Sequence, residues 1–414
     1  MNAAKAATLD RVVPKQKASK THAAPHHMRE AQLARDVEIA TPAMQQYFKL
    51  KYDHPDCLLF YRMGDFYELF FDDAIQAAKI LDIALTKRGK HGEREVEMCG
   101  VPAHSHEAYL EKLIASGVKV AICEQMENPA EAKKKRGYKA IVNRDVVRVV
   151  TPGTITEDSL LDARTNNYLA ALGTTAAEKT LGWVDLSSGQ FGLQRLEAST
   201  KLDEVIACMS PREILLPDSF AAQAPLEMGE TAITLQPDSL FDSNRGATRL
   251  KEIFKLDALD SLGELSRSDL SAVSALLNYI DLTQKGVMPR LEKPRLIARN
   301  EWMAIDPATR RNLELTHALS GGRDGSLLHA IDRTVTAGGG RLLERRLSSP
   351  SRDLQTVQDR HNAIKACLNN TSDSEDLRDA LKATPDMERA LSRLSLDRGG
   401  PRDLAAIRNG LDQA

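Results

Sequence analysis

The chain has few of the residues that build redox centres, zinc sites or membrane spans. Aromatic residues make up 5% of its 414 positions, and no apolar run approaches the length of a membrane span. Its cysteines are scattered and form no Cys-x-x-Cys pair: Cys57, Cys99, Cys123, Cys208 and Cys367. This usage favours reduced thiols and argues against a disulfide framework or a structural zinc site. The N-terminus also lacks the continuous apolar segment of a secretory signal, so we expect a cytoplasmic protein with no membrane contact.

A phosphate-binding loop for nucleotides is also missing. No segment fits Gly-x4-Gly-Lys-Ser/Thr, since Gly89-Lys90 is followed by His91 and the glycines of residues 321–325 have no lysine among them. The run Gly338–Gly340 lacks this context and is interpreted as a flexible start for a helix at Arg341. We therefore expect no ATP hydrolysis, no catalytic residue and no metal or cofactor site in this chain.

The remaining composition is that of a folded protein with two or three domains. Hydrophobic residues account for 42% of the chain and charged residues for 28%, which is enough for several cores. The net charge of −2 does not by itself indicate a nucleic-acid partner, but residues 1–29 carry six Lys/Arg against one Asp, and residues 131–148 carry seven against two acids. Such runs are typical of solvated tails and loops, and phosphate binding is the alternative.

Residues 1–40 show no hydrophobic periodicity and are rich in Ala, Lys and His. This composition predicts a basic, largely disordered extension, with a short helix near Met28–Val37. The three histidines in it, His22, His26 and His27, are interpreted as part of a solvated tail and not as a metal site.

Helix and strand patterns alternate from Thr41 to Val150 and predict a compact mixed α/β domain over residues 41–150. Thr41 is expected to cap a helix that has Pro42 at its first position. Two further helices are predicted, one from Asp72 or Asp73 with Ile75, Ala78 and Leu81 inward, and one from Ser105 to Gly117. The predicted strands are Leu58–Met63, Phe66–Phe71, Val118–Cys123 and Ile141–Val150, and a basic insert, Lys133–Lys139, precedes the last of them.

The segment Arg62–Phe71 carries the most informative pattern. Side chains alternate along a strand, so Phe66 and Glu68 lie on one face while Tyr67 and Leu69 lie on the other. A small sheet with one wet face cannot bury both rows, so at least one is expected to reach a surface. An exposed aromatic ring beside a carboxylate suits a wedge that stacks on a base while its neighbour hydrogen-bonds the base edge. The alternative is that Phe66 belongs to the core and Glu68 is simply solvated.

The frame Gly64-Asp65-Phe66-Tyr67-Glu68-Leu69-Phe70 closely resembles the mismatch-sensing loop of the MutS family of DNA mismatch repair proteins. Further blocks match the family in the same order: Thr41–Tyr47, Leu85–Gly89, Ala121–Gln125, Thr151–Thr154, Asp306–Glu314 and Pro401–Leu404. One Phe-x-Glu would be weak evidence, whereas colinear blocks from about residue 41 to the end of the chain are strong evidence.

The resemblance implies recognition of mispaired or unpaired bases in duplex DNA, with Phe66 as the wedge and Glu68 as the base-edge partner. It further implies a homodimer that bends DNA, recruits MutL through its second domain and becomes a sliding clamp with ATP and Mg²⁺. In the family the ATPase lies downstream of the clamp, so this chain is expected to be truncated before both. The implied location is the cytoplasm, in association with the nucleoid.

Six further residues are candidates for contacts with the DNA backbone or groove walls. They are Met63, Asp65, Lys87, Arg88, Arg144 and Arg148. For Lys87-Arg88-Gly89 the alternative is the basic C-terminal end of a helix, where such residues stabilise free carbonyl groups.

Residues 152–290 are predicted to form a second α/β domain after the turn Thr151-Pro152-Gly153. Its predicted elements are the strands Tyr168–Leu172, Leu181–Leu186 and Gln190–Leu196, and the helices Lys201–Met209 and Leu262–Gln284. This domain resembles the MutS connector, which implies a ribonuclease-H-like topology. A nuclease there is an alternative function, with Asp185 as a metal-binding acid. Its possible partners Asp203, Glu204 and Glu213 have the pattern of a helix surface and not of an inward cluster.

Residues 300–414 show only helical stripes of leucine after Asp306, which predicts the first part of an all-α core/lever domain. Where the family often has Arg-Trp-Leu, this chain has Arg345-Arg346-Leu347. The remaining alternative function is a non-sensing MutS-like scaffold in recombination, in which the wedge has lost its role.

Overall fold

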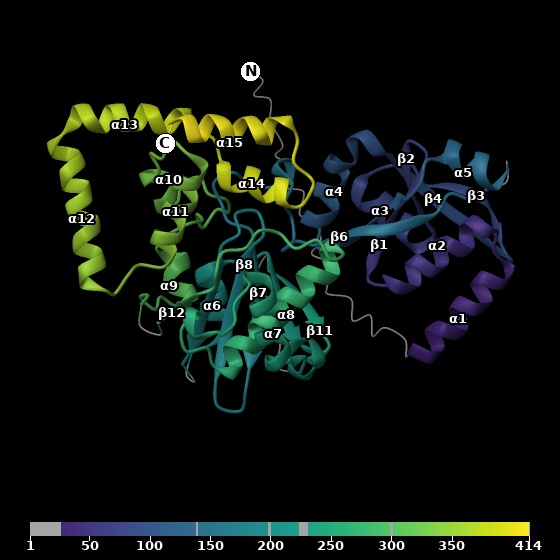
Figure 1. Ribbon diagram of the computed structural model, residues 1–414, viewed down its shortest axis with the longest axis horizontal. Helices are drawn as coiled ribbons and strands as arrows, with labels where there is room; N and C mark the ends of the chain where they lie inside the picture. The colour runs from purple at the N-terminus through teal and green to yellow at the C-terminus, as the bar shows by residue number, and fades with distance from the viewer. Residues whose placement is uncertain (1–25, 138–139, 198–199, 223–230, 299–300, 414) are drawn as a thin grey trace, which may run out of the picture.

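The computed structural model describes residues 26–137, 140–197, 200–222, 231–298 and 301–413, which form two α/β domains and a helical region (Figure 1). Residues 1–25, which were predicted to be disordered, lie outside the described residues. Residues 26–39 differ from that prediction because they form the helix α1 (His26–Ile39), which is longer than the short helix expected there.

The first domain is a six-stranded sheet in the order β3-β4-β2-β1-β5-β6, in which only β1 and β5 are parallel. Its elements are α2 (Pro42–Asp53), β1 (Cys57–Met63), β2 (Phe66–Phe70), α3 (Phe71–Leu81), β3 (Thr86–His91), β4 (Arg94–Pro102), α4 (His106–Ala115), β5 (Lys119–Gln125), α5 (Pro129–Arg136) and β6 (Arg144–Val150). Helices α3 and α4 pack on one face of the sheet, and α2 packs on the other through Tyr47. Both faces of the sheet are therefore largely dry.

The predicted helices and strands of this domain are present, but several details were wrong. The hairpin β3–β4 was not predicted, so Lys87-Arg88-Gly89 lies in a strand and not at a helix exit. Ala78 and Leu81 are buried as predicted, but Ile75 points outward with 44% of its surface exposed, because α3 buries Ala74 and Ala77 in its place. Thr41 occupies the N-cap position of α2 but makes no capping hydrogen bond with its side chain.

The second domain is another six-stranded sheet, in the order β11-β10-β7-β8-β9-β12. Its elements are β7 (Tyr168–Thr174), β8 (Lys179–Asp185), β9 (Phe191–Leu196), α6 (Leu202–Met209), β10 (Glu213–Pro217), β11 (Ala232–Gln236), α7 (Ser243–Phe254), α8 (Arg267–Gln284) and β12 (Arg295–Ile297). Strands β7, β8 and β9 are antiparallel, whereas β10 and β11 continue from β7 in parallel. Helix α8 lies so close to the sheet that a Cβ on Gly173 would stand 2.1 Å from the Ser268 carbonyl oxygen.

Four elements of this domain were not predicted, namely α7, β10, β11 and β12. Helix α8 begins at Arg267 and not at Leu262, because Ser266 and Asp269 form a capping box there. Glu213 was expected on a helix surface, but it lies on β10, between β11 and β7, and is fully buried.

Within residues 301–413, the described part of the last region, the regular elements are helices, as predicted, and an isolated bridge joins Trp302 and Ser351. The helices are α9 (Pro307–Asn312), α10 (Leu327–Ile331), α11 (Ala337–Ser348), α12 (Leu354–Asn369), α13 (Thr371–Ala383), α14 (Met387–Ser395) and α15 (Pro401–Gln413). The glycines Gly338–Gly340 lie inside α11, which Thr336 caps, so the predicted start at Arg341 was too late.

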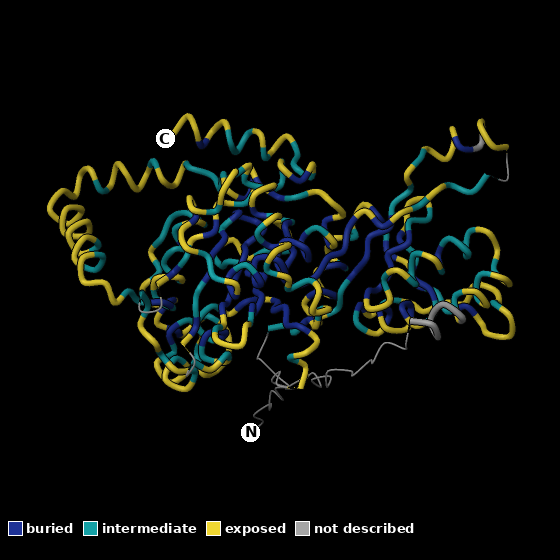
Figure 2. The backbone as a smooth tube through the Cα atoms, turned by 60° about the horizontal axis from the view of Figure 1, so that its bottom comes forward, coloured by how far each residue is buried: buried dark blue, intermediate teal, exposed yellow. Residues whose placement is uncertain are grey.

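Helices α12 and α13 extend away from the rest of the molecule, while α14 lies against the two α/β domains (Figure 1). In Figure 2 the α/β domains contain long buried runs, whereas the outlying helices are mostly exposed. Leu368 on α12 has 71% of its surface exposed. None of the helices in the described part of the chain combines the length and apolar content needed to cross a bilayer.

Candidate nucleic-acid interface

Phe66 is positioned by a tight hairpin between β1 and β2. Met63 pairs with Phe66 across a two-residue turn, in which Gly64 has a φ of 61°, a conformation that favours glycine. The Arg62 Nε donates to the Gly64 carbonyl oxygen at 2.6 Å, and the Ala103 amide donates to the Asp65 carbonyl oxygen at 2.8 Å. The turn is therefore fixed from both sides, and the first residue after it is held at the end of the sheet.

The Phe66 ring emerges at the surface, while the rest of β2 enters the core. Phe66 has 48% of its surface exposed, against 3% for Tyr67 and 2% for Phe70. Its neighbour on β4 is Pro102, and Gly100 leaves space beside the ring, since a Cβ there would lie 3.9 Å from Phe66. The expectation that a row of β2 reaches the surface thus holds only for its first residues, because α2 covers Phe70.

Glu68 lies on the same face as Phe66 but is half-buried. Its Oε2 accepts a hydrogen bond from the Arg88 guanidinium on β3 at 2.6 Å. Burial raises the pKa of Glu68 above its ordinary value, and the positive charges of Arg88 and Arg144 oppose that rise. The strand β3 that supplies Arg88 was missing from the predicted fold, and with it this ion pair.

The other candidate contact residues differ in how far their side chains are exposed. Asp65 is exposed at the turn, and Lys87 is exposed on β3, where it pairs with Glu95. Arg144 is partly buried behind the hairpin: its Nε donates to the Arg62 carbonyl oxygen at 2.7 Å, and its Nη2 lies 3.3 Å from the Met63 sulfur. Met63 and Arg144 therefore support the hairpin from within.

Arg148 has no surface to offer a phosphate. Its side chain is 6% exposed and forms an ion pair with Glu157, and burial lowers its pKa well below the ordinary value. A second hydrogen bond to the Glu157 Oε2, at 2.8 Å, fixes both side chains. This burial removes Arg148 from the candidates for DNA contact.

A network beneath Phe66 was not predicted at all. The Tyr67 hydroxyl donates to the Glu124 carboxylate, and the Arg62 guanidinium lies 5.2 Å from the centre of the Tyr67 ring. The Arg62 guanidinium also lies 3.9 Å from the Glu124 Oε1. The network anchors the residue next to Phe66. Because Tyr67 and Glu124 lie on strands far apart in the chain, no local pattern could reveal it.

The acids of the second domain do not assemble into a nuclease site. The Asp185 carboxylate accepts from the Ser187 hydroxyl at 2.6 Å and from the Asn167 amide at 3.1 Å, so it closes a turn. Glu213 accepts from the hydroxyls of Thr234 and Tyr279, at 2.6 and 2.7 Å. Across the described ranges, no group of three or more His, Cys, Asp or Glu side chains could hold a metal ion.

Comparison with known proteins places the three regions in one family. Residues 41–159 match the model of MutS domain I, residues 167–292 that of MutS domain II, and residues 308–414 that of MutS domain III. The chain is 54% identical over 374 residues to the DNA mismatch repair protein MutS of Dinoroseobacter shibae, and 53% identical over 378 residues to that of Ruegeria pomeroyi. The matches cover 90% of this chain but only 42% and 43% of those relatives.

Proposed function

Because this chain belongs to the MutS family, we propose that its first domain recognises mispaired or unpaired bases in duplex DNA through Phe66 and Glu68. The observation that carries the proposal is the exposed Phe66 ring at the end of an otherwise buried strand, on a hairpin fixed by Arg62 and Ala103. A wedge must be both exposed and rigid, since a mobile side chain would lose the energy of insertion in ordering itself.

The physical basis of recognition is the cost of unstacking. Inserting a ring between base pairs costs roughly a few kcal/mol per step, and less where the pair is already mispaired. Stacking on a base returns about 1–3 kcal/mol whatever the base, so Phe66 suits a sensor of many different mispairs. Discrimination arises from the difference in DNA deformation and not from base identity.

Glu68 adds a hydrogen bond to the edge of the displaced base. A carboxylate near phosphates repels DNA, so Glu68 assists binding only where a base edge lies within its reach. In the free protein Arg88 occupies the Glu68 Oε2. On binding, the Arg88 guanidinium moves to a phosphate and leaves Glu68, whose half-buried position favours protonation, to bond with the base.

The activities of the longer family members are proposed for any protein that contains this chain. They are dimerisation, MutL recruitment through the second domain, and conversion to a sliding clamp by an ATPase that uses ATP and Mg²⁺. The three antiparallel strands β7–β9, followed by β10 and β11 in parallel, support a ribonuclease-H-like topology for the second domain. Cytoplasmic, nucleoid-associated location is part of the same proposal.

A chimera tests the wedge. In it, this chain replaces the matched part of the Dinoroseobacter shibae relative, and the affinities for a mismatched and a matched duplex are compared by fluorescence anisotropy. Phe66→Ala is expected to reduce the ratio of the two affinities by about ten-fold or more, because the stacking energy is lost. Phe66→Trp is expected to retain most of the ratio.

Leu85→Ala is the matched control, since Leu85 is another large apolar residue of the first domain and has 46% of its surface exposed. It should leave the ratio unchanged. If Phe66→Ala also leaves it unchanged, Phe66 is not the wedge, and the scaffold function becomes the better description. The variant must keep the unfolding midpoint of the parent chimera for this conclusion to be drawn.

A further inference from the structure

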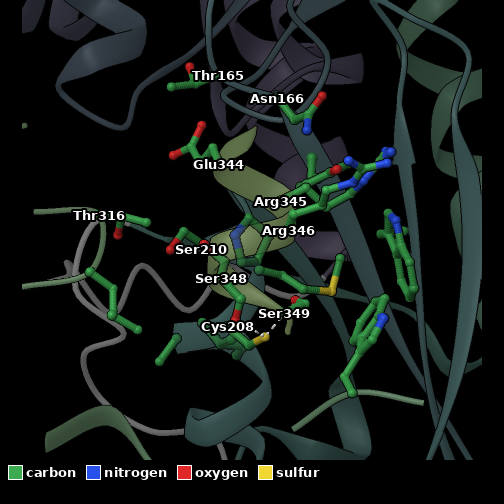
Figure 3. A pocket seen from close by; sticks show the side chains of 18 of the residues that line it. Thr165, Asn166, Cys208, Ser210, Thr316, Glu344, Arg345, Arg346, Ser348 and Ser349 are labelled. Atoms are coloured by element: carbon green, nitrogen blue, oxygen red, sulfur yellow. Dashed lines mark hydrogen bonds between the residues drawn. The ribbon is translucent and has the colours of Figure 1, made fainter. Parts of the chain in front are cut away.

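A cavity of about 1520 Å³ lies at the junction of the second domain and the helical region. Its walls come from the C-terminal end of α6, the face of the sheet, and helices α9, α11 and α12. In Figure 3, Glu344 lies on the side of Thr165 and Asn166, and Cys208 and Ser349 form the opposite end. The cavity shares no residue with the first domain.

Two of the arginines that line the cavity, Arg346 and Arg360, lack the acidic partners that arginines have elsewhere in the same junction. Arg341 pairs with Asp386 at 2.6 Å, and Arg164 with Asp332 at 2.8 Å. By contrast, Arg346 on α11 makes no side-chain hydrogen bond or ion pair with any described residue, and the same is true of Arg360 on α12. The two cavity arginines are thus available to a ligand.

The two guanidinium groups also act on each other. Burial, together with the positive charges of Arg360 and Arg345, lowers the pKa of Arg346. Arg345 bonds only to neutral oxygens nearby, such as the Gln190 Oε1 at 2.8 Å. Like charges held together in a partly enclosed space repel each other unless an anion lies between them.

Four of the six acids that line the cavity are engaged by other residues or only partly charged. Glu301 pairs with Arg295, Glu388 with Arg341, and Asp353 accepts from the Thr356 hydroxyl at the start of α12. Glu344 is partly buried, which raises its pKa to about 7, so it carries only part of a negative charge near neutral pH. Over the whole lining, seven arginines face six acids, one of them only partly charged, so the cavity keeps a net positive charge.

We propose that this cavity binds a small di- or triphosphate anion, held by Arg346 and Arg360 and by hydroxyls such as that of Ser348. Guanidinium groups match phosphate oxygens in charge and geometry, and a multiply charged anion can bridge two of them. Free pyrophosphate and the phosphate tail of a nucleotide share this chemistry. Because α11 and α12 close the cavity against the second domain, the anion would fix the helical region relative to that domain.

Binding in this cavity can be followed by the tryptophan fluorescence of the chain itself. It has two tryptophans, Trp183 and Trp302, and both line the cavity, with ring centres 6.0 Å apart. Titration of the 414-residue chain with pyrophosphate, at constant ionic strength, is expected to change its tryptophan fluorescence with a saturable curve. Parallel titrations with ADP separate free phosphate from a nucleotide: tighter binding of ADP assigns a nucleotide, and equal binding assigns the phosphates alone.

The double variant Arg346→Gln/Arg360→Gln is expected to weaken binding by roughly ten-fold or more, since it removes two charge-assisted contacts. The control is Arg408→Gln, an exposed arginine on α15 whose side chain hydrogen-bonds to Asn409, and it should bind as the parent does. The proposal is overturned if pyrophosphate and ADP give no saturable signal in the millimolar range. It is equally overturned if the folded double variant binds as tightly as the control.

Discussion

Arginine side chains have opposite roles in two regions of this molecule: in one they are exposed and exchangeable, and in the other they are buried and structural. At the tip of the β1–β2 hairpin, Phe66 is exposed and Glu68 forms an ion pair with Arg88, whose side chain is 52% exposed. At the segment of residues 158–166, which joins the two α/β domains, arginines from the helical region are buried and donate hydrogen bonds to the backbone. The first arrangement can exchange partners with a ligand, whereas the second cannot do so without loss of structure.

The buried contacts hold the joining segment by its backbone. The Arg389 guanidinium donates to the Asp162 and Thr165 carbonyl oxygens at 2.9 and 2.8 Å, and Arg341 donates to the Ala163 carbonyl oxygen at 3.0 Å. Both arginines are almost completely buried, at 1% and 3% exposure. Carbonyl groups bound in this way fix the path of the chain, so exposure and not residue type separates a ligand-ready charge from a structural one.

The largest expected effect on the free energy of unfolding comes from replacing one of the buried arginines. Arg341→Met should lower the free energy of unfolding by about 3–5 kcal/mol, because it removes a buried guanidinium together with its ion pair to Asp386 and its hydrogen bond to the Ala163 carbonyl oxygen. Urea unfolding followed by tryptophan fluorescence measures it. The control Arg408→Met removes an exposed arginine and should cost less than about 0.5 kcal/mol. Equal effects of both variants would show that burial does not distinguish these arginines.

A second buried charge tests the junction between the α/β domains. Glu213 accepts from the Thr151 hydroxyl and the Gly153 amide of the linker, and Lys119 of the first domain lies 3.8 Å away. Glu213→Gln should lower the free energy of unfolding by about 2 kcal/mol, because an amide NH₂ must face one of these donors. The same urea experiment applies, with the exposed Glu264→Gln as the control. No difference between the two variants would contradict a structural role for Glu213.

The sequence predicted the regular parts of the fold because their residues alternate or repeat with a clear period. It failed at β3 and β10 for local reasons. Strand β3, Thr86–His91, is charged and exposed along its length, so no apolar alternation marks it. In β10 every residue is buried, including Glu213, and a buried acid in a short strand looks like a helix surface until its distant partners are known.

The candidate site was also predicted only in part, because the sequence shows local patterns but not contacts between distant strands. Phe66 and Glu68 stand in a local frame that carries its own signal, and their exposure could be reasoned from strand alternation. The partners that fix them come from elsewhere: Arg88 lies on an unpredicted strand, and the network of Tyr67 with Glu124 spans two strands. Arg148 was misjudged because its basic neighbours suggested phosphate contact, while Glu157 beyond the end of β6 neutralises it.

The smallest expected effect on stability comes from the exposed ion pair of Arg88 with Glu68. Arg88→Met should change the free energy of unfolding by less than about 1 kcal/mol, since exposed ion pairs contribute little. The same change should raise the pKa of Glu68, because Arg88 no longer opposes the effect of burial. The measurement is a carboxyl NMR titration of the chain with labelled glutamate, with Glu68→Gln to assign the signal.

The raised pKa also gives the variant a defined pH dependence. A carboxyl group with a higher pKa in the folded state stabilises the fold fully at pH values below its unfolded pKa, and this contribution is lost as the pH rises through the folded pKa. Arg88→Met should therefore lose more stability than the parent as the pH rises above the ordinary carboxyl value of 4.5. Lys87→Met is the matched control, because Lys87 is the adjacent basic residue of β3 but pairs with Glu95. If Lys87→Met shifts the Glu68 titration as much as Arg88→Met does, the 2.6 Å contact does not control Glu68, and the exchange of Arg88 between Glu68 and a phosphate loses its basis.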